Sequence, residues 1–139
     1  MRIIDGDILN VKHGIICHQI NCQHKMGAGL AAQIRHKYPK HYADFMSAVP
    51  HLGGLCITEI NWDLYVVGIY AQDYYGRTGL FTQYPALEKG LQAVARMSEK
   101  QHLPVYIPYG IGCGLAGGDW RIVSGIITKT LPNSIIVKK

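Results

Sequence analysis

Short apolar runs rich in β-branched residues recur along the chain, and each has the composition of a buried β-strand. They span residues 3–4, 14–20, 55–60, 64–69, 105–107 and 134–137. Because these runs lack a clean polar alternation, we expect a sheet that is covered on both faces.

Helical spacing is found in three of the intervening segments, most clearly in residues 85–102, where Pro85 suits a first helical turn. Its apolar stripe consists of Leu87, Leu91, Val94 and Ala95. A second helix is expected to begin near Gly29 and to stop at Pro39, with a short helical continuation after it.

The third helix is expected to follow Asp119, a suitable N-cap, and to end before Pro132. Its core-facing residues are predicted to be Ile122, Val123, Ile126, Ile127 and Leu131. Strands separated by helices predict an α/β fold with three layers, α/β/α, and a mixed central sheet. The 139 residues fit a single domain.

The composition is that of a globular protein, with 48% hydrophobic and 17% charged residues. No apolar run reaches the roughly 20 residues that cross a bilayer, and the start of the chain lacks a secretory signal, so we expect no membrane contact and a cytoplasmic location. The four cysteines show no CxxC spacing, which favours reduced thiols. The net charge of +5 favours anionic partners, but the absence of a dense basic run argues against nucleic acid.

Two glycine-rich loops each follow a predicted strand and precede a predicted helix. The first glycine loop, residues 21–29, carries Gly27 and Gly29, and the second glycine loop, residues 108–118, has five glycines among residues 110–118. Backbone N–H groups without side chains around them can approach a phosphate at a helix N-terminus. Each loop alone is equally well explained as a structural turn, but two on one sheet edge suggest a pyrophosphate clamp. Neither loop matches a P-loop or a GxGxxG motif.

Several segments together resemble the macrodomain family, and they occur in the family's order over nearly the whole chain. They are GDI at 6–8, HQINC at 18–22, MGAGLA at 26–31 and GIGCGL at 110–115. The resemblance is greatest to the branch that contains the terminal ADP-ribose hydrolases and the yeast-type ADP-ribose-1''-phosphate phosphatase.

That resemblance implies an ADP-ribose site. Asp7 would bind the adenine amino group while Ile8 packs on the base, although a turn aspartate is the simpler reading of Asp7. Asn21 would face the distal ribose, a role compatible with an Asx cap on its own loop. The remaining predicted ligand contacts are Met26, Gly27, Ala28, Gly29, Leu30, Gln72, Tyr109, Gly110, Ile111, Gly112, Cys113, Gly114 and Leu115.

The resemblance also bears on catalysis. Gln72 stands where the hydrolases of the branch use a lysine, and Ala116 stands where the glutamate-directed enzymes use an aspartate, which disfavours a Schiff-base mechanism. The phosphatase of the branch has a histidine at the place of His18. The predicted catalytic residues are therefore His18, Asn21 and Asp119. A neutral imidazole near its reference pKa of about 6.5 would activate water. The simpler readings are a buried strand histidine for His18 and an N-cap for Asp119.

Three functions remain open at this point: hydrolysis of ADP-ribose-1''-phosphate, a non-catalytic reader of ADP-ribose or of ADP-ribosylated macromolecules, and removal of ADP-ribose from protein or nucleic acid. A Rossmann-like domain for another nucleotide is the remaining alternative. We expect a monomer that needs no cofactor. Zinc is not expected, because Cys17 and His18 point to opposite faces of one strand.

Overall fold

A mixed six-stranded sheet forms the centre of the computed structural model, which describes all 139 residues. Its strands are β1 (Arg2–Asp5), β2 (Gly14–Asn21), β3 (Leu55–Asn61), β4 (Leu64–Gln72), β5 (Val105–Pro108) and β6 (Ile135–Lys138). They lie in the order β1-β6-β5-β2-β4-β3, and only β3 and β4 pair antiparallel. This pair is antiparallel because the two residues between β3 and β4 allow a hairpin but no crossover. The predicted mixed sheet is confirmed.

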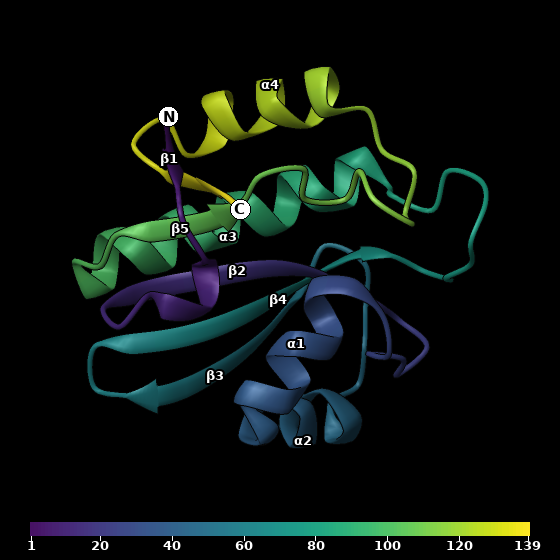
Figure 1. Cartoon of the computed structure of the whole chain (residues 1–139), viewed down its shortest axis with the longest axis horizontal. Helices are drawn as coiled ribbons and strands as arrows, with labels where there is room; N and C mark the ends of the chain where they lie inside the picture. Colours follow the sequence, from purple (N-terminus) through teal and green to yellow (C-terminus); the bar gives the residue numbers. More distant parts are fainter.

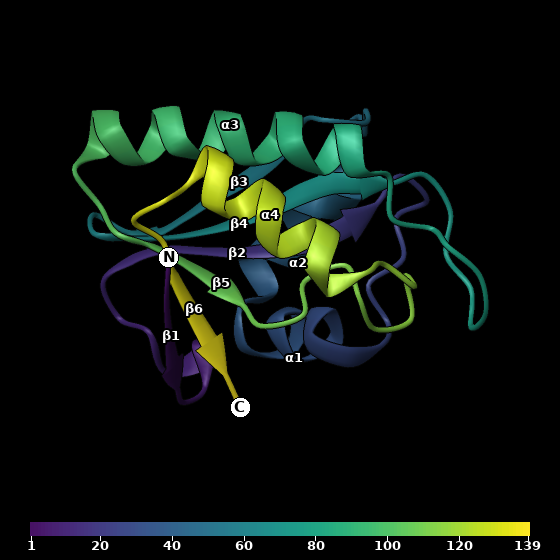
Figure 2. The same ribbon diagram turned by 90° about the horizontal axis from the view of Figure 1, so that it is seen from above.

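Helices cover both faces of the sheet. They are α1 (Gly29–Lys37), α2 (Pro39–Ser47), α3 (Tyr84–Gln101) and α4 (Trp120–Thr130), and a short 3-10 helix, η1 (Ile8–Asn10), follows β1. Figure 1 shows α3 and α4 on one side of the sheet and α1 and α2 on the other, and Figure 2 shows the same layers from above. The predicted three-layer α/β/α architecture is confirmed. No helix combines the length and hydrophobicity that a membrane crossing requires.

Strand β2 lies in the middle of the sheet and is buried on both faces. Ile15 and Cys17 belong to the core beneath α3 and α4, whereas Ile16 and Ile20 pack on the opposite side against residues of α1 and α2. Successive side chains of a strand point to opposite faces, so a strand buried on both sides needs an unbroken apolar run. This burial explains the sequence of β2 and places the polar residues His18 and Gln19 on opposite faces.

The apolar stripe predicted for residues 85–102 packs as expected, with Leu87, Leu91 and Val94 fully buried in α3. Between them, Gly90 allows a close approach to β4, because a Cβ added there would lie 2.3 Å from Cγ2 of Ile69. Pro39 ends α1 as predicted and is also the first residue of α2.

One prediction for α4 is wrong. Val123 and Ile127 are fully buried, one helical turn apart, but Ile122 is 46% exposed. A residue adjacent to Val123 is rotated by about 100° around the helix axis, because an α-helix has 3.6 residues per turn. Ile122 therefore lies beside the buried stripe and not in it.

Candidate functional site

A cavity of about 670 Å³ opens at the edge of the sheet where the parallel strands β2, β4 and β5 end. Both glycine loops line it. The first contributes Asn21 and residues 24–29, and the second contributes Pro108, Gly110, Ile111, Gly112, Gly114, Leu115 and Ala116. The loops thus lie side by side, as the sequence predicted, and the cavity has the size of a typical small-molecule site.

Backbone N–H groups in both loops lack partners within the protein. In the first glycine loop these include the N–H groups of Gly27, Ala28 and Gly29, and in the second those of Gly110, Gly112, Gly114, Leu115 and Ala116. The first loop runs directly into α1, whose N-cap residue, Ala28, supplies no side-chain bond to the first helical turn. Unpaired N–H groups next to a helix N-terminus form an electropositive surface that suits an anion.

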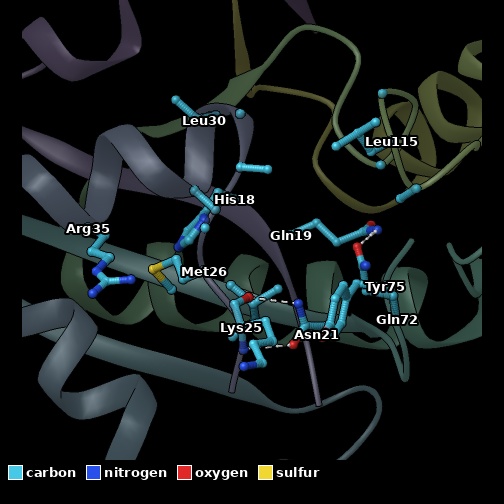
Figure 3. A pocket seen from close by; sticks show the side chains of 18 of the residues that line it. His18, Gln19, Asn21, Lys25, Met26, Leu30, Arg35, Gln72, Tyr75 and Leu115 are labelled. Atoms are coloured by element: carbon cyan, nitrogen blue, oxygen red, sulfur yellow. Dashed lines mark hydrogen bonds between the residues drawn. The ribbon is translucent and has the colours of Figure 1, made fainter. Parts of the chain in front are cut away.

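Asn21 holds the first glycine loop in shape. Its Nδ2 donates to the Lys25 carbonyl at 2.7 Å, and its Oδ1 accepts from the N–H groups of Gln23 and Lys25 at 3.0 and 3.2 Å. Figure 3 shows Asn21 beside Lys25 at the bottom of the site. The Asx-type role considered for Asn21 is therefore found, and a contact with ligand stays a prediction.

The second glycine loop is tied to the segment before α3. The Phe81 and Thr82 N–H groups donate to the Ala116 carbonyl at 2.7 and 3.1 Å, and the Thr82 hydroxyl donates to the Gly112 carbonyl at 2.6 Å. Gly112 has a left-handed φ of +74°, and a Cβ there would lie 2.7 Å from Oε1 of Gln19. The loop therefore needs glycine at this position for both conformation and space.

Gln19 is a site residue that our sequence reasoning did not single out. Its Nε2 donates to Oε1 of Gln72 at 2.9 Å, which links β2 to β4 (Figure 3). The same Nε2 donates to Oγ1 of Thr82 at 2.8 Å, and Thr82 in turn bonds the second glycine loop. Its own Oε1 is buried without a hydrogen-bond partner. The available signal was a glutamine in a mostly apolar strand, since buried polar groups are normally paired.

His18 lines the cavity but is only 2% exposed. Its Nε2 lies 2.9 Å from Nε2 of His41, a residue of α2. Burial, and secondarily the proximity of His41, hold the pKa of His18 well below its ordinary value. The expectation of an imidazole near its reference pKa is therefore wrong, because desolvation disfavours the charged form. The hydrogen-bond partner of His18 is the side chain of His41.

Positive charge in the cavity wall comes from Lys25 and Arg35. The Arg35 guanidinium lies 3.8 Å from the centre of the Tyr42 ring, which holds it by a cation–π contact. Gln72, which stands in the lysine position, donates from Nε2 to the Tyr74 carbonyl at 3.0 Å. Tyr75 also lines the cavity.

No model of a known protein family matches the sequence. The chain is 30% identical to an uncharacterised 17.5 kDa protein from the tk-vs intergenic region of Enterobacteria phage T4, over 91% of this chain and 87% of the phage protein. It is 19% identical to a DNA ADP-ribosyl transferase–DNA ADP-ribosyl glycohydrolase fusion protein of Thermosipho africanus, over 94% of this chain but only 39% of that protein.

Solved structures share the fold over nearly the whole chain. A protein from Bacteroides thetaiotaomicron superposes with a TM-score of 0.88 at 23% identity, covering 99% of this chain and 98% of its own. A macrodomain protein from Streptomyces coelicolor gives 0.81 at 21%, with 99% and 97% covered. Thermosipho africanus DarTG in complex with ADP-ribose gives 0.80 at 18%, with 99% and 41% covered. The chain belongs to the family of the phage protein, and its fold is the macrodomain fold. The resemblance to macrodomains stated from the sequence is confirmed at the level of the fold, and the branch within that family stays a prediction.

Five of the predicted site residues of this macrodomain are not among those that line the cavity: Asp7, Ile8, Tyr109, Cys113 and Asp119. Asp7 caps η1 by accepting from the Leu9 N–H at 3.0 Å, and it pairs with Lys139 at 3.0 Å. These two contacts lower the pKa of Asp7. Ile8 is buried, and the Tyr109 N–H donates to the Val137 carbonyl at the end of β6.

Asp119 is the N-cap of α4. Its carboxylate accepts from the Arg121 N–H at 2.9 Å and pairs with the Arg121 guanidinium at 3.1 Å, which together lower the pKa of Asp119. Burial raises the pKa of Cys113, whose Sγ donates to the Ile111 carbonyl. All four cysteines are free, and no three His, Cys, Asp or Glu side chains gather closely enough to hold a metal ion.

Proposed function

We propose that the macrodomain binds ADP-ribose, with the diphosphate between the two glycine loops. The observation that carries this proposal is the set of unpaired backbone N–H groups that both loops contribute to one cavity. A diphosphate offers several negatively charged oxygens to such groups, and charge-assisted hydrogen bonds are the stronger kind. The Thermosipho protein that holds ADP-ribose has the same fold, which supports the choice of ligand.

In this proposal the adenine extends beyond the cavity toward Asp7 and Ile8. The Asp7 carboxylate receives one bond on each oxygen, which leaves acceptor capacity for an amino group. The distal ribose lies toward Asn21, Met26 and Gln72, which line the other part of the site. Residues 1–139 act here as one domain and as a monomer.

The finer proposal is hydrolysis of ADP-ribose-1''-phosphate to ADP-ribose and inorganic phosphate. Water attacks phosphorus and the bond between phosphorus and O1'' breaks. O1'' takes a proton from solvent, and the oxygen of the attacking water stays on the phosphate with its second proton. Neutral His18, in the cavity wall, accepts a proton from the attacking water, and the cations Lys25 and Arg35 lie on the same wall for the phosphate charge. Asn21 positions the loop, and a role for Asp119 stays a prediction.

Two other outcomes are possible for the same cavity. A reader would bind ADP-ribose without releasing a product. A glycohydrolase would release ADP-ribose from a modified macromolecule, as the name of the Thermosipho relative describes, but Gln72 and Ala116 replace the residues that the resemblance associates with that chemistry.

Calorimetric titration with ADP-ribose tests the binding proposal, and no heat of binding at millimolar ligand would refute it. A phosphate-release assay on ADP-ribose-1''-phosphate, with wild type and His18→Ala, tests the phosphatase. We expect His18→Ala to bind ADP-ribose but to lose at least about 100-fold in kcat, the lower range for general-base catalysis. Equal turnover by both proteins would refute the mechanism. Release of ADP-ribose from an ADP-ribosylated oligonucleotide or protein would identify the glycohydrolase instead.

A further inference from the structure

A chain of four hydrogen-bonded side chains runs from His18 in the cavity wall to His41 of α2, on to Thr58 of β3 and back to Asp44 of α2. Nε2 of His18 lies 2.9 Å from Nε2 of His41, Nδ1 of His41 lies 2.8 Å from Oγ1 of Thr58, and Thr58 donates to the Asp44 carboxylate at 2.7 Å. His18, His41 and Thr58 are 2%, 0% and 1% exposed. The chain joins β2, α2 and β3, so the fold and not a local turn assembles it.

The hydrogen-bond directions along this chain follow from the single hydroxyl proton of Thr58 when both imidazole rings are neutral. The single hydroxyl proton of Thr58 goes to the carboxylate, so Oγ1 of Thr58 can only accept from Nδ1–H of His41. A neutral His41 that is protonated on Nδ1 has a lone pair on Nε2. That lone pair accepts from Nε2–H of His18, and Nδ1 of His18 is then left without a proton.

The neutral state of both rings is consistent with their surroundings. Burial lowers the pKa of His41 to about 4, against an opposing effect of Asp44, and burial holds the pKa of His18 lower than normal as well. Nδ1 of His18 is buried and has no hydrogen-bond partner in the protein. An unpaired buried nitrogen costs free energy unless a ligand or water supplies the missing bond.

We propose that His41, held by Thr58 and Asp44, is a positioning residue that keeps His18 in the Nε2–H tautomer and leaves the buried Nδ1 as an unprotonated acceptor. The functional consequence rests on the proposed phosphatase. An imidazole in this tautomer offers the site a lone pair and no proton. Once the ring or the first glycine loop moves enough to expose the buried Nδ1, this nitrogen can accept from a water molecule or a ribose hydroxyl, but it cannot donate to a phosphate oxygen.

The tautomer of His18 determines which groups of the site can contact the phosphate and which can contact the attacking water. The negative phosphate oxygens must be met by the loop N–H groups and by Lys25 or Arg35, since His18 would meet them with a lone pair. His18 accepts a proton from the attacking water and later returns it to solvent, and O1'' takes its proton from solvent. The tautomer thereby selects which atom of the substrate complex can lie next to His18.

The tautomers can be measured directly by long-range ¹H–¹⁵N correlation NMR on the ¹⁵N-labelled protein at pH 7. His18→Gln and His41→Gln spectra assign the two rings by loss of their signals. We expect a non-protonated Nδ1 in His18 and a protonated Nδ1 in His41. A protonated Nδ1 in His18 would overturn the proposal, and this measurement needs neither substrate nor activity.

Thr58→Val removes the acceptor of His41 while keeping the shape of the side chain, and Thr58→Ser retains the hydroxyl. We expect the valine variant to show mixed His18 tautomers and the serine variant to match wild type. With ADP-ribose-1''-phosphate, kcat should fall about 10- to 100-fold in the valine variant at unchanged KM, part of what general-base catalysis contributes, and return in the serine variant. Wild-type tautomers in Thr58→Val would overturn the role of Thr58 in fixing the His41 tautomer. If that variant fails to fold, the spectrum of the wild-type protein tests the proposal alone. Absence of turnover in wild type would refute the phosphatase, while the tautomer result would still stand.

Discussion

Alanine at Gly27 or at Gly114 is expected to weaken ADP-ribose binding without harming the fold. Both glycines line the cavity, their N–H groups are unpaired, and a Cβ added at either position meets no heavy atom within 4 Å. Neither glycine has a backbone conformation that an L-residue avoids. The new methyl group would therefore stand in open space beside N–H groups that the diphosphate is proposed to reach.

The expected rise in Kd follows from the hydrogen bonds between loop N–H groups and diphosphate that the methyl group would block. A hydrogen bond to a charged group contributes roughly 1.5–3 kcal/mol, so losing one should raise Kd by about 10- to 150-fold. The free energy of unfolding should stay the same or rise by about 0.4–1 kcal/mol, since alanine restricts the unfolded chain more than glycine does. Calorimetry with ADP-ribose and urea denaturation measure the two quantities.

Gly125→Ala provides the matched control, because Gly125 is an exposed residue of α4, outside the cavity lining, and a Cβ there also meets nothing within 4 Å. It should keep the wild-type Kd and gain about 0.5–1 kcal/mol of stability. If Gly27→Ala and Gly114→Ala fold normally and both bind ADP-ribose as tightly as Gly125→Ala, the diphosphate does not lie between the loops and the reasoning fails.

Three further predictions concern stability and reactivity. His41 has a pKa of about 4 in the folded state, below the ordinary 6.5, so the unfolded state binds more protons between these values. The contribution of His41 to stability should be full above pH 6.5 and fall by about 3 kcal/mol as the pH drops to 4, in addition to the loss in the same direction from His18. Urea titrations of wild type and His41→Gln check this, and an identical pH dependence in both would contradict it. Burial raises the pKa of Cys17 to about 12, so a thiol reagent at pH 7 should modify Cys17 only when the protein unfolds. Peptide mass spectrometry would measure the modification, and rapid labelling of the folded protein would mean that β2 opens. Asp119→Ala should lower the free energy of unfolding by about 1 kcal/mol because it removes the N-cap of α4, whereas Asp119→Asn should retain the cap. A loss of turnover in Asp119→Asn at unchanged stability would instead assign Asp119 a catalytic role.

Local patterns were sufficient for the elements and for the loops. The stripe of Leu87, Leu91 and Val94 predicted α3 because one helix face must be apolar wherever a helix packs on a sheet. The glycine spacing predicted both loops, since backbone without side chains is a local property. Ile122 was assigned wrongly because hydrophobicity alone does not say which of two adjacent apolar residues faces the core.

The sequence by itself thus determined the layers of this macrodomain and the two loops that line its cavity, because periodicity and glycine content act over a few residues. Only the tertiary structure decided the state of His18, whose pKa and tautomer depend on His41, Thr58 and Asp44, residues 23 to 40 positions away that come from other elements. Hydrogen-bond direction and desolvation depend on which groups meet in space, and packing of α2 and β3 beside β2 brings these groups together.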